Sequence, residues 1–131
     1  MNFTYNDGGR SKYFKGKSGD CVTRAIAIVL EKDYKEVYDK CKKYLGYSPR
    51  NGVKKKDTRK LMEQFGFNWY SLMGIGTGCT THLRKEELPK GRIVCKCTSH
   101  LVACIDGEVN DTHDSTRGGN RCVYGYWKTE G

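Results

Sequence analysis

Residues 19–30 read GDCVTRAIAIVL, and this stretch decides how the rest of the chain packs. Its last ten residues are nearly all apolar, which predicts a helix that is central and buried. Asp20, or Ser18 before it, is a suitable N-cap for a helix that begins at Cys21. The stretch therefore predicts a buried helix with a cysteine in its first turn.

The regions on the C-terminal side of this helix predict two more helices and then strands. Residues 34–45 and 56–65 each carry apolar side chains on one stripe, as amphipathic helices do. The second half of the chain is rich in β-forming residues, with strands expected at 69–73, 92–98, 101–105, 108–113 and 121–127, and a short helix at 82–88.

The order of these elements predicts an α+β fold, with N-terminal helices packed on a C-terminal antiparallel sheet. Asp106-Gly107 is a strong signal for a two-residue hairpin between two of the strands. We expect one domain over residues 1–131, with an N-terminal arm (1–17), a helical layer (18–66) and the sheet (67–131).

The chain is basic, with a net charge of +9 from 24 Lys and Arg against 15 Asp and Glu. Much of the excess lies in residues 40–60, where Asp57 is the only acid among Lys40, Lys42, Lys43, Arg50, Lys54, Lys55, Lys56, Arg59 and Lys60. Such a stretch forms either a solvated surface or a face that attracts acidic proteins, phosphates or nucleic acid.

Several features predict a cytoplasmic protein without membrane contact. No apolar run approaches the roughly 20 residues of a membrane span, and residues 1–17 lack the apolar centre of a secretory signal. Because the seven cysteines are odd in number and no export signal accompanies them, we interpret them as reduced thiols.

Cys21 is the first candidate for chemistry. A thiol in the first turn of a helix faces unpaired amide protons and the positive end of the helix dipole, and both favour the nucleophilic thiolate. The same amides could stabilise an oxyanion. The alternative is that Cys21 is simply a small core residue, because cysteine is among the most often buried residue types.

His100 is the candidate base, and the hairpin signal supplies its partner. If Asp106-Gly107 is a two-residue turn, Ala103 pairs with Asn110, and His100 and Asp111 lie on the same face as diagonal neighbours. Asp111 could then orient the imidazole, whereas Asn110 points to the other face. His113 shares the predicted face and is an alternative base; equally, His100 and Asp111 could only satisfy each other.

A cysteine that opens a buried helix, a histidine that opens a strand and an aspartate after a tight hairpin resemble the papain-like cysteine peptidases. The compact bacteriocin-processing type is the most similar. This resemblance implies a papain-like topology, a Cys21-His100-Asp111 triad, a peptide or protein substrate and no cofactor. The papain-like pattern has a glutamine about six residues before the cysteine, where this chain has Lys15. Asn6, or the Cys21 amide with a neighbour, would have to replace it.

A second resemblance covers nearly the whole chain. Residues 19–27, GDCVTRAIA, and 111–127, DTHDSTRGGNRCVYGYW, look like small phage-encoded proteins of unassigned function. This implies a phage protein in the cytoplasm of a bacterial host cell, and no particular reaction.

Weaker signals surround the proposed triad. The candidate oxyanion-stabilising or substrate-binding residues are Asn6, Asp20, His113 and Arg117. Loops 74–80 and 114–120 are expected to form the rims of the cleft. Cys79 and His82, with Cys95 and Cys97 downstream, suggest a zinc set, but paired Cys-x-x-Cys units are absent, so we expect no metal.

Two functions follow from the sequence. The first is a thiol hydrolase that cleaves an amide, isopeptide or related acyl bond. The second is a catalytically silent host-takeover or anti-defence protein that engages host protein or nucleic acid through the basic residues 40–60.

Overall fold

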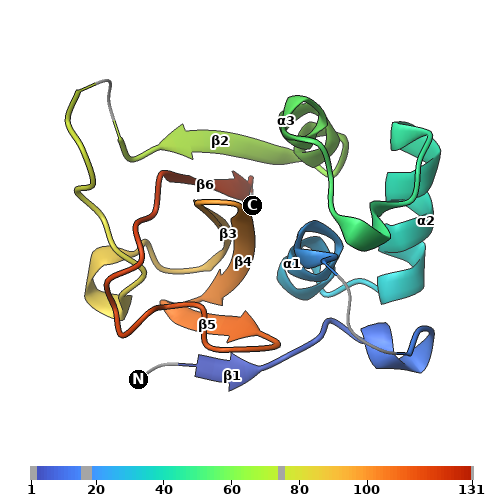
Figure 1. Ribbon diagram of the computed structural model, residues 1–131, viewed down its shortest axis with the longest axis horizontal. Helices are drawn as coiled ribbons and strands as arrows, with labels where there is room; N and C mark the ends of the chain where they lie inside the picture. The colour runs from blue at the N-terminus through green and yellow to red at the C-terminus, as the bar shows by residue number, and fades with distance from the viewer. Residues whose placement is uncertain (1–2, 16–18, 74–75, 131) are drawn as a thin grey trace.

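The computed structural model describes residues 3–15, 19–73 and 76–130, which form three α-helices and a six-stranded sheet (Figure 1). The helices are α1 (Cys21–Leu30), α2 (Tyr34–Leu45) and α3 (Lys55–Gln64). The strands are β1 (Phe3–Tyr5), β2 (Phe67–Ser71), β3 (Arg92–Cys97), β4 (His100–Ile105), β5 (Glu108–Asp111) and β6 (Gly125–Thr129). Short 3-10 helices occur at η1 (Arg10–Lys12), η2 (Pro49–Asn51) and η3 (Lys85–Glu87). The fold is therefore mixed α+β.

The sheet has the strand order β1-β5-β4-β3-β6-β2. All neighbours are antiparallel except β1, which pairs with β5 in parallel, Phe3 opposite Val109. The expectation of a purely antiparallel sheet is therefore wrong at one edge. The strand responsible lies in the segment that was expected to be an arm, and three residues are too short for a periodic signal.

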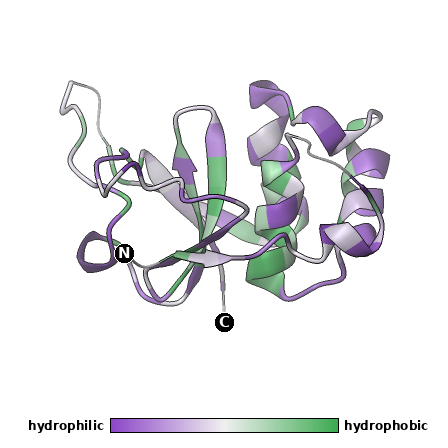
Figure 2. Ribbon diagram, turned by 60° about the horizontal axis from the view of Figure 1, so that its bottom comes forward, coloured by the Kyte–Doolittle hydropathy of each residue, from purple (hydrophilic) through white to green (hydrophobic). Residues whose placement is uncertain are grey.

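The helix α1 holds the centre of the fold, as its composition predicts. Every residue from Val22 to Val29 is buried, and the helix packs on β3, β4 and β5. In Figure 1 it lies between the sheet and α2. Figure 2 shows hydrophobic residues concentrated on this helix, whereas the outer surfaces of the helical layer are mainly hydrophilic.

A second apolar cluster lies on the other face of the sheet. Cys95, Cys97 and Cys104 are fully buried there with Val102 and Val109, which confirms them as small core residues. Leu83, Leu88 and Val123 cover them from the irregular segments that precede β3 and β6. The second face is thus closed by loops instead of helices.

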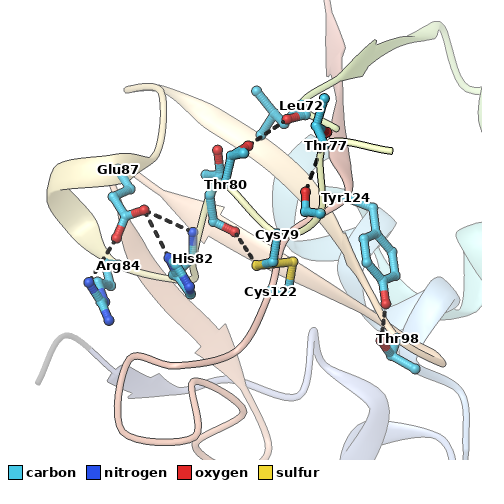
Figure 3. The surroundings of a disulfide bond; sticks show 12 residues. Leu72, Thr77, Cys79, Thr80, His82, Arg84, Glu87, Thr98, Cys122 and Tyr124 are labelled. Atoms are coloured by element: carbon cyan, nitrogen blue, oxygen red, sulfur yellow. Dashed lines mark hydrogen bonds and ion pairs between the residues drawn. A yellow bond between two sulfur atoms is a disulfide. The ribbon is translucent and has the colours of Figure 1, made fainter. Parts of the chain in front are cut away.

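A disulfide joins these two covering segments (Figure 3). Cys79 and Cys122 are bonded, with their Cα atoms 5.9 Å apart. The expectation of seven reduced thiols is therefore wrong for this pair, and Cys79 is not free to bind zinc with His82. Because disulfides are typical of oxidising compartments, the cysteines do not support the expected reducing environment. In the described residues, no helix has both the length and the apolar character needed to cross a membrane.

The covering segments also differ from the elements expected there. Of residues 82–88 only Lys85–Glu87 form a turn of 3-10 helix, while His82 pairs in an isolated bridge with Cys122. The strand expected at 121–127 begins at Gly125, because the backbone before it bonds elsewhere: the amide of Val123 donates to the Thr81 carbonyl at 2.9 Å.

Candidate active site

A cleft of about 1160 Å³ opens beside the first turn of α1, and both Cys21 and His100 line it. Its other walls come from described residues between 5 and 15, from residues 51–55, and from the chain around Ser99 and Thr112. The loops expected as rims, 74–80 and 114–120, contribute no lining residue in their described parts. In Figure 1 the described part of the loop that follows β2 lies at the end of the sheet far from the helices.

Cys21 is the first residue of α1 and is the only one of the five free cysteines that is not buried. Burial raises the pKa of its thiol, but hydrogen bonds from the His100 side chain and the Leu101 backbone outweigh that effect. The net pKa lies below the ordinary value of 9.0, and the charge of Arg24 contributes to this. The surroundings of Cys21 therefore favour the thiolate.

His100 opens β4 and lies between the sulfur and a carboxylate. Its Nε2 is 2.7 Å from Oδ2 of Asp111, and its side chain also forms a hydrogen bond with Cys21. Burial lowers the pKa of His100, but the hydrogen bonds to Asp111 and Cys21 raise it to about 9 from the ordinary 6.5. The ring is therefore held in its protonated form near neutral pH.

Asp111 ends β5 and is held by donors on several sides. The backbone amide of Thr112 lies 2.7 Å from its carboxylate, the hydroxyl of Ser115 donates at 3.2 Å, and Arg24 lies at 3.4 Å. Burial raises the pKa of Asp111, but the hydrogen bond and charge of His100, the Thr112 amide and the charge of Arg24 lower it below 3.8. The acid that orients His100 is therefore itself fixed and ionised.

The predicted hairpin register accounts for this contact. Ile105 pairs with Glu108, and Ala103 with Asn110, so the two-residue turn is confirmed. Side-chain alternation then places Asp111 on the face of His100. Asn110 lies on the opposite face, as expected, and its amide oxygen accepts from Asn6 at 3.2 Å.

Asp20 lies just before Cys21 but does not cap the helix with its side chain. Its buried carboxylate instead binds Arg24 and the Tyr34 hydroxyl, and Arg10 lies 3.2 Å away. Since the carboxylate is fully committed to these partners, it is a structural support for the first turn. Arg24 thus joins Asp20 to Asp111 inside the protein.

The amides of the first turn remain outside the helical hydrogen-bond ladder. The first bond of α1 runs from the amide of Arg24 to the carbonyl of Asp20 at 3.1 Å. The amides of Cys21 and Val22 precede it and have no intrahelical acceptor. Backbone amides in the first turn of a helix can donate to an oxyanion.

The remaining candidate residues divide between the cleft and other places. His113 lines the cleft, exposed, with its ring centroid 5.5 Å from that of His100. Lys15, which stands in place of the papain-like glutamine, also lines it. Asn6 and Arg117 do not. The Asn6 side chain is held by Asn110 and by its own turn, and the charge of Arg117 acts on Cys97 in the second core.

Two contributors were missed by the sequence reasoning. Arg24 is the single charged residue within the otherwise apolar α1, and a lone buried cation needs a carboxylate partner, which is a usable signal. Ser115 is buried against Asp111, and nothing in its local sequence distinguishes it from an ordinary loop serine.

One group of three potential metal ligands occurs among the described residues. His100, Asp111 and His113 offer ligand atoms within 4.8 Å of one another. Within this group His100 and Asp111 are also joined directly by a hydrogen bond.

Comparison of the chain with protein-family models, with curated proteins and with solved structures finds no match in any of the three. The papain-like resemblance therefore depends on the residues and geometry of this chain alone.

Proposed function

We propose that the protein is a papain-like thiol hydrolase that cleaves an amide, isopeptide or related acyl bond. The observation that carries this proposal is that His100 forms hydrogen bonds with both Cys21 and Asp111. Cys21 and His100 line the same cleft. The pKa shifts of all three groups favour their charged forms. A thiolate beside an imidazolium is the resting state that nucleophilic cysteine catalysis requires.

The proposed reaction has two steps, acylation of Cys21 and hydrolysis of the resulting thioester. The Cys21 sulfur forms a bond to the acyl carbon, and the carbonyl oxygen takes the negative charge. His100 then gives its proton to the leaving nitrogen or oxygen as that bond breaks, which leaves a thioester and a neutral imidazole. In the second step His100 takes a proton from water, the hydroxide attacks the thioester, and the carbon–sulfur bond breaks to restore thiolate and imidazolium.

The first-turn amides of Cys21 and Val22 supply the oxyanion site in this proposal. They replace the papain-like glutamine, which this chain lacks. Loss of an oxyanion donor costs roughly 10²- to 10³-fold in rate. Because these amides take the place of the glutamine, we expect measurable hydrolase activity.

A direct test uses p-nitrophenyl acetate as the acyl donor. We expect a stoichiometric burst of p-nitrophenol, with the acetyl group found on Cys21 by peptide mass spectrometry. Cys21→Ala abolishes the burst, and His100→Ala slows it by on the order of 10²-fold. His82→Ala, which alters a histidine outside the cleft lining, is the matched control and keeps the wild-type rate. A burst that persists in Cys21→Ala contradicts the proposal.

One observation favours the second candidate, a binding protein. The basic side chains between Lys40 and Lys60 are all exposed, while Asp57 is half-buried and accepts from the Tyr47 hydroxyl at 2.8 Å. This basic face would bind an acidic host protein or nucleic acid through salt-sensitive contacts. Salt-dependent binding of a single-stranded oligonucleotide, unchanged in Cys21→Ala, would support it.

A further inference from the structure

Three lysines line the cleft around Cys21 and come from different parts of the chain. Lys15 belongs to the N-terminal segment, Lys55 begins α3, and Lys96 lies near the end of β3. Lys15 and Lys55 are exposed, and Lys96 is half-buried. Among the ion pairs found in the described residues, none includes any of the three. Their charges therefore face the cleft without a carboxylate partner from the described chain.

The carboxylates of the cleft lining are already occupied. Asp7 accepts hydrogen bonds from the backbone amides of Gly9 and Ser11, at 2.9 and 3.1 Å. Asp20 is buried against Arg10 and Arg24. Arg10 and Arg24 balance the charge of Asp20, and Asp7 alone remains to offset three lysines, so the charge of the cleft lining is positive.

Two of the lysines are tied by geometry to the surroundings of the thiol. Lys96 pairs across the sheet with Leu101, whose backbone bonds to Cys21. Lys55 follows residues 51–53, which lie next to the chain that leads into α1. A methyl group on Gly19 would be 3.6 Å from the Asn51 carbonyl oxygen. Both lysines therefore belong to segments that lie next to the surroundings of Cys21 and line the same cleft.

We propose that the cleft selects acidic peptide substrates, with carboxylates on the residues that flank the scissile bond. This inference depends on the proposed hydrolase function and names the substrate class of the same site. Like charges that converge on one cleft repel one another, and an anionic ligand relieves that repulsion as it binds. A polypeptide is favoured over nucleic acid because it also brings the acyl carbon that the thiolate attacks.

The test compares two alkylating reagents that differ mainly in charge. Iodoacetate is anionic and iodoacetamide is neutral, so the ratio of their rates at Cys21 reports the electrostatic potential at the sulfur. We expect the triple variant Lys15→Gln, Lys55→Gln, Lys96→Gln to lower this ratio by about threefold or more at low ionic strength. The control triple, Lys32→Gln, Lys90→Gln, Lys128→Gln, removes the same charge from exposed positions outside the cleft and leaves the ratio unchanged.

The outcomes separate the two proposals. If iodoacetamide does not label Cys21 selectively in the wild-type protein, the hydrolase proposal fails and this inference fails with it. If iodoacetamide labels Cys21 but the two triple variants give equal ratios, only the charge inference fails.

A competition experiment then tests the substrate class. Hexaglutamate is expected to protect Cys21 from iodoacetamide at concentrations where hexalysine does not, and the cleft triple variant loses this protection. Protection by oligo(dT) but not by hexaglutamate would overturn the assignment to acidic peptides.

Discussion

The His100 imidazole lies between an acid and a thiol, and both neighbours favour its protonated form. Its pKa is raised from 6.5 to about 9. Its contribution to the free energy of unfolding is therefore complete below pH 6.5 and is lost as the pH rises through about 9. The Cys21 pKa is lowered, so its contribution has the opposite sign: it is present above pH 9.0 and is lost as the pH falls through the lowered value. The thiolate–imidazolium pair therefore occupies a window whose upper limit is near pH 9.

The Asp111 contact predicts a shift that NMR can measure without a substrate. In Asp111→Asn the neutral amide no longer favours imidazolium, so the pKa of His100 should fall by about one unit or more. The chain has three histidines, and their ring Cε1–H signals can be followed separately through a pH titration.

The matched control for this titration is Glu87→Gln. It removes the carboxylate 3.1 Å from Nδ1 of His82 and should leave His100 unchanged. A wild-type His100 that titrates near 6.5 would contradict the account of this contact.

The contacts of individual residues could be predicted from the sequence where a turn signal or an apolar run determines them. The Asp106-Gly107 turn sets the register that joins His100 to Asp111, and a helix start at Cys21 follows from the apolar run after it. Asn6 and Arg117 do not line the cleft. The Asn6 side chain is held by Asn110, and no local pattern encodes such a contact between distant segments.

At the scale of elements, Arg24 connects α1 to β5. It is buried between Asp20 and Asp111, so it shares its one positive charge between two buried carboxylates, with which Arg10 and His100 also pair. Helix and hairpin are thereby held at the separation that the thiol and imidazole need. We therefore expect a substitution of Arg24, which lies outside the triad, to change both the free energy of unfolding and the pKa of Asp111.

Arg24→Met should lower the free energy of unfolding by about 3–5 kcal/mol, because it removes the buried cation that Asp20 and Asp111 share. It should also raise the pKa of Asp111, which Arg24 helps to hold down. Urea unfolding at pH 7 measures the first effect.

The control is Lys35→Met, which breaks the 2.8 Å pair with Asp39 on the exposed face of α2. An exposed pair contributes little, so this variant should unfold close to wild type. Equal midpoints for the two variants would show that the buried link does not stabilise the fold.

The helices and the central hairpin could be predicted because each has a continuous apolar pattern or a turn signal. The parallel pairing of β1, and the position of β6 between β3 and β2, could not. These pairings join residues far apart in the chain, and the three residues of β1 carry no periodicity. The short helix expected at 82–88 fails for a related reason, since His82 pairs with distant Cys122.

At the scale of the whole molecule, the disulfide ties together the loops that close the second face of the sheet. Protein purified without reductant and unfolded in iodoacetamide should carry five modified cysteines, and seven after reduction. Modification of all seven without reductant would show that this bond is absent.

Because the disulfide closes a loop with a sequence separation of 43, its reduction should lower the free energy of unfolding by about 4 kcal/mol in the chain-entropy model. Neither Cys79 nor Cys122 lines the cleft, so the reactivity of Cys21 in the folded protein should not change on reduction. The bond could not be predicted from the sequence, because an odd cysteine count without spacing motifs gives no pairing.

The central claim is that folding brings His100 to Cys21 and thereby activates the thiol. The most direct measurement is the rate of Cys21 alkylation by iodoacetamide against pH, followed by intact mass spectrometry in wild type and in His100→Ala. We predict that the wild-type rate begins to rise well below pH 9.0, and that the rise moves toward the ordinary thiol range in His100→Ala. Identical profiles in the two proteins, both rising only near pH 9, would contradict it.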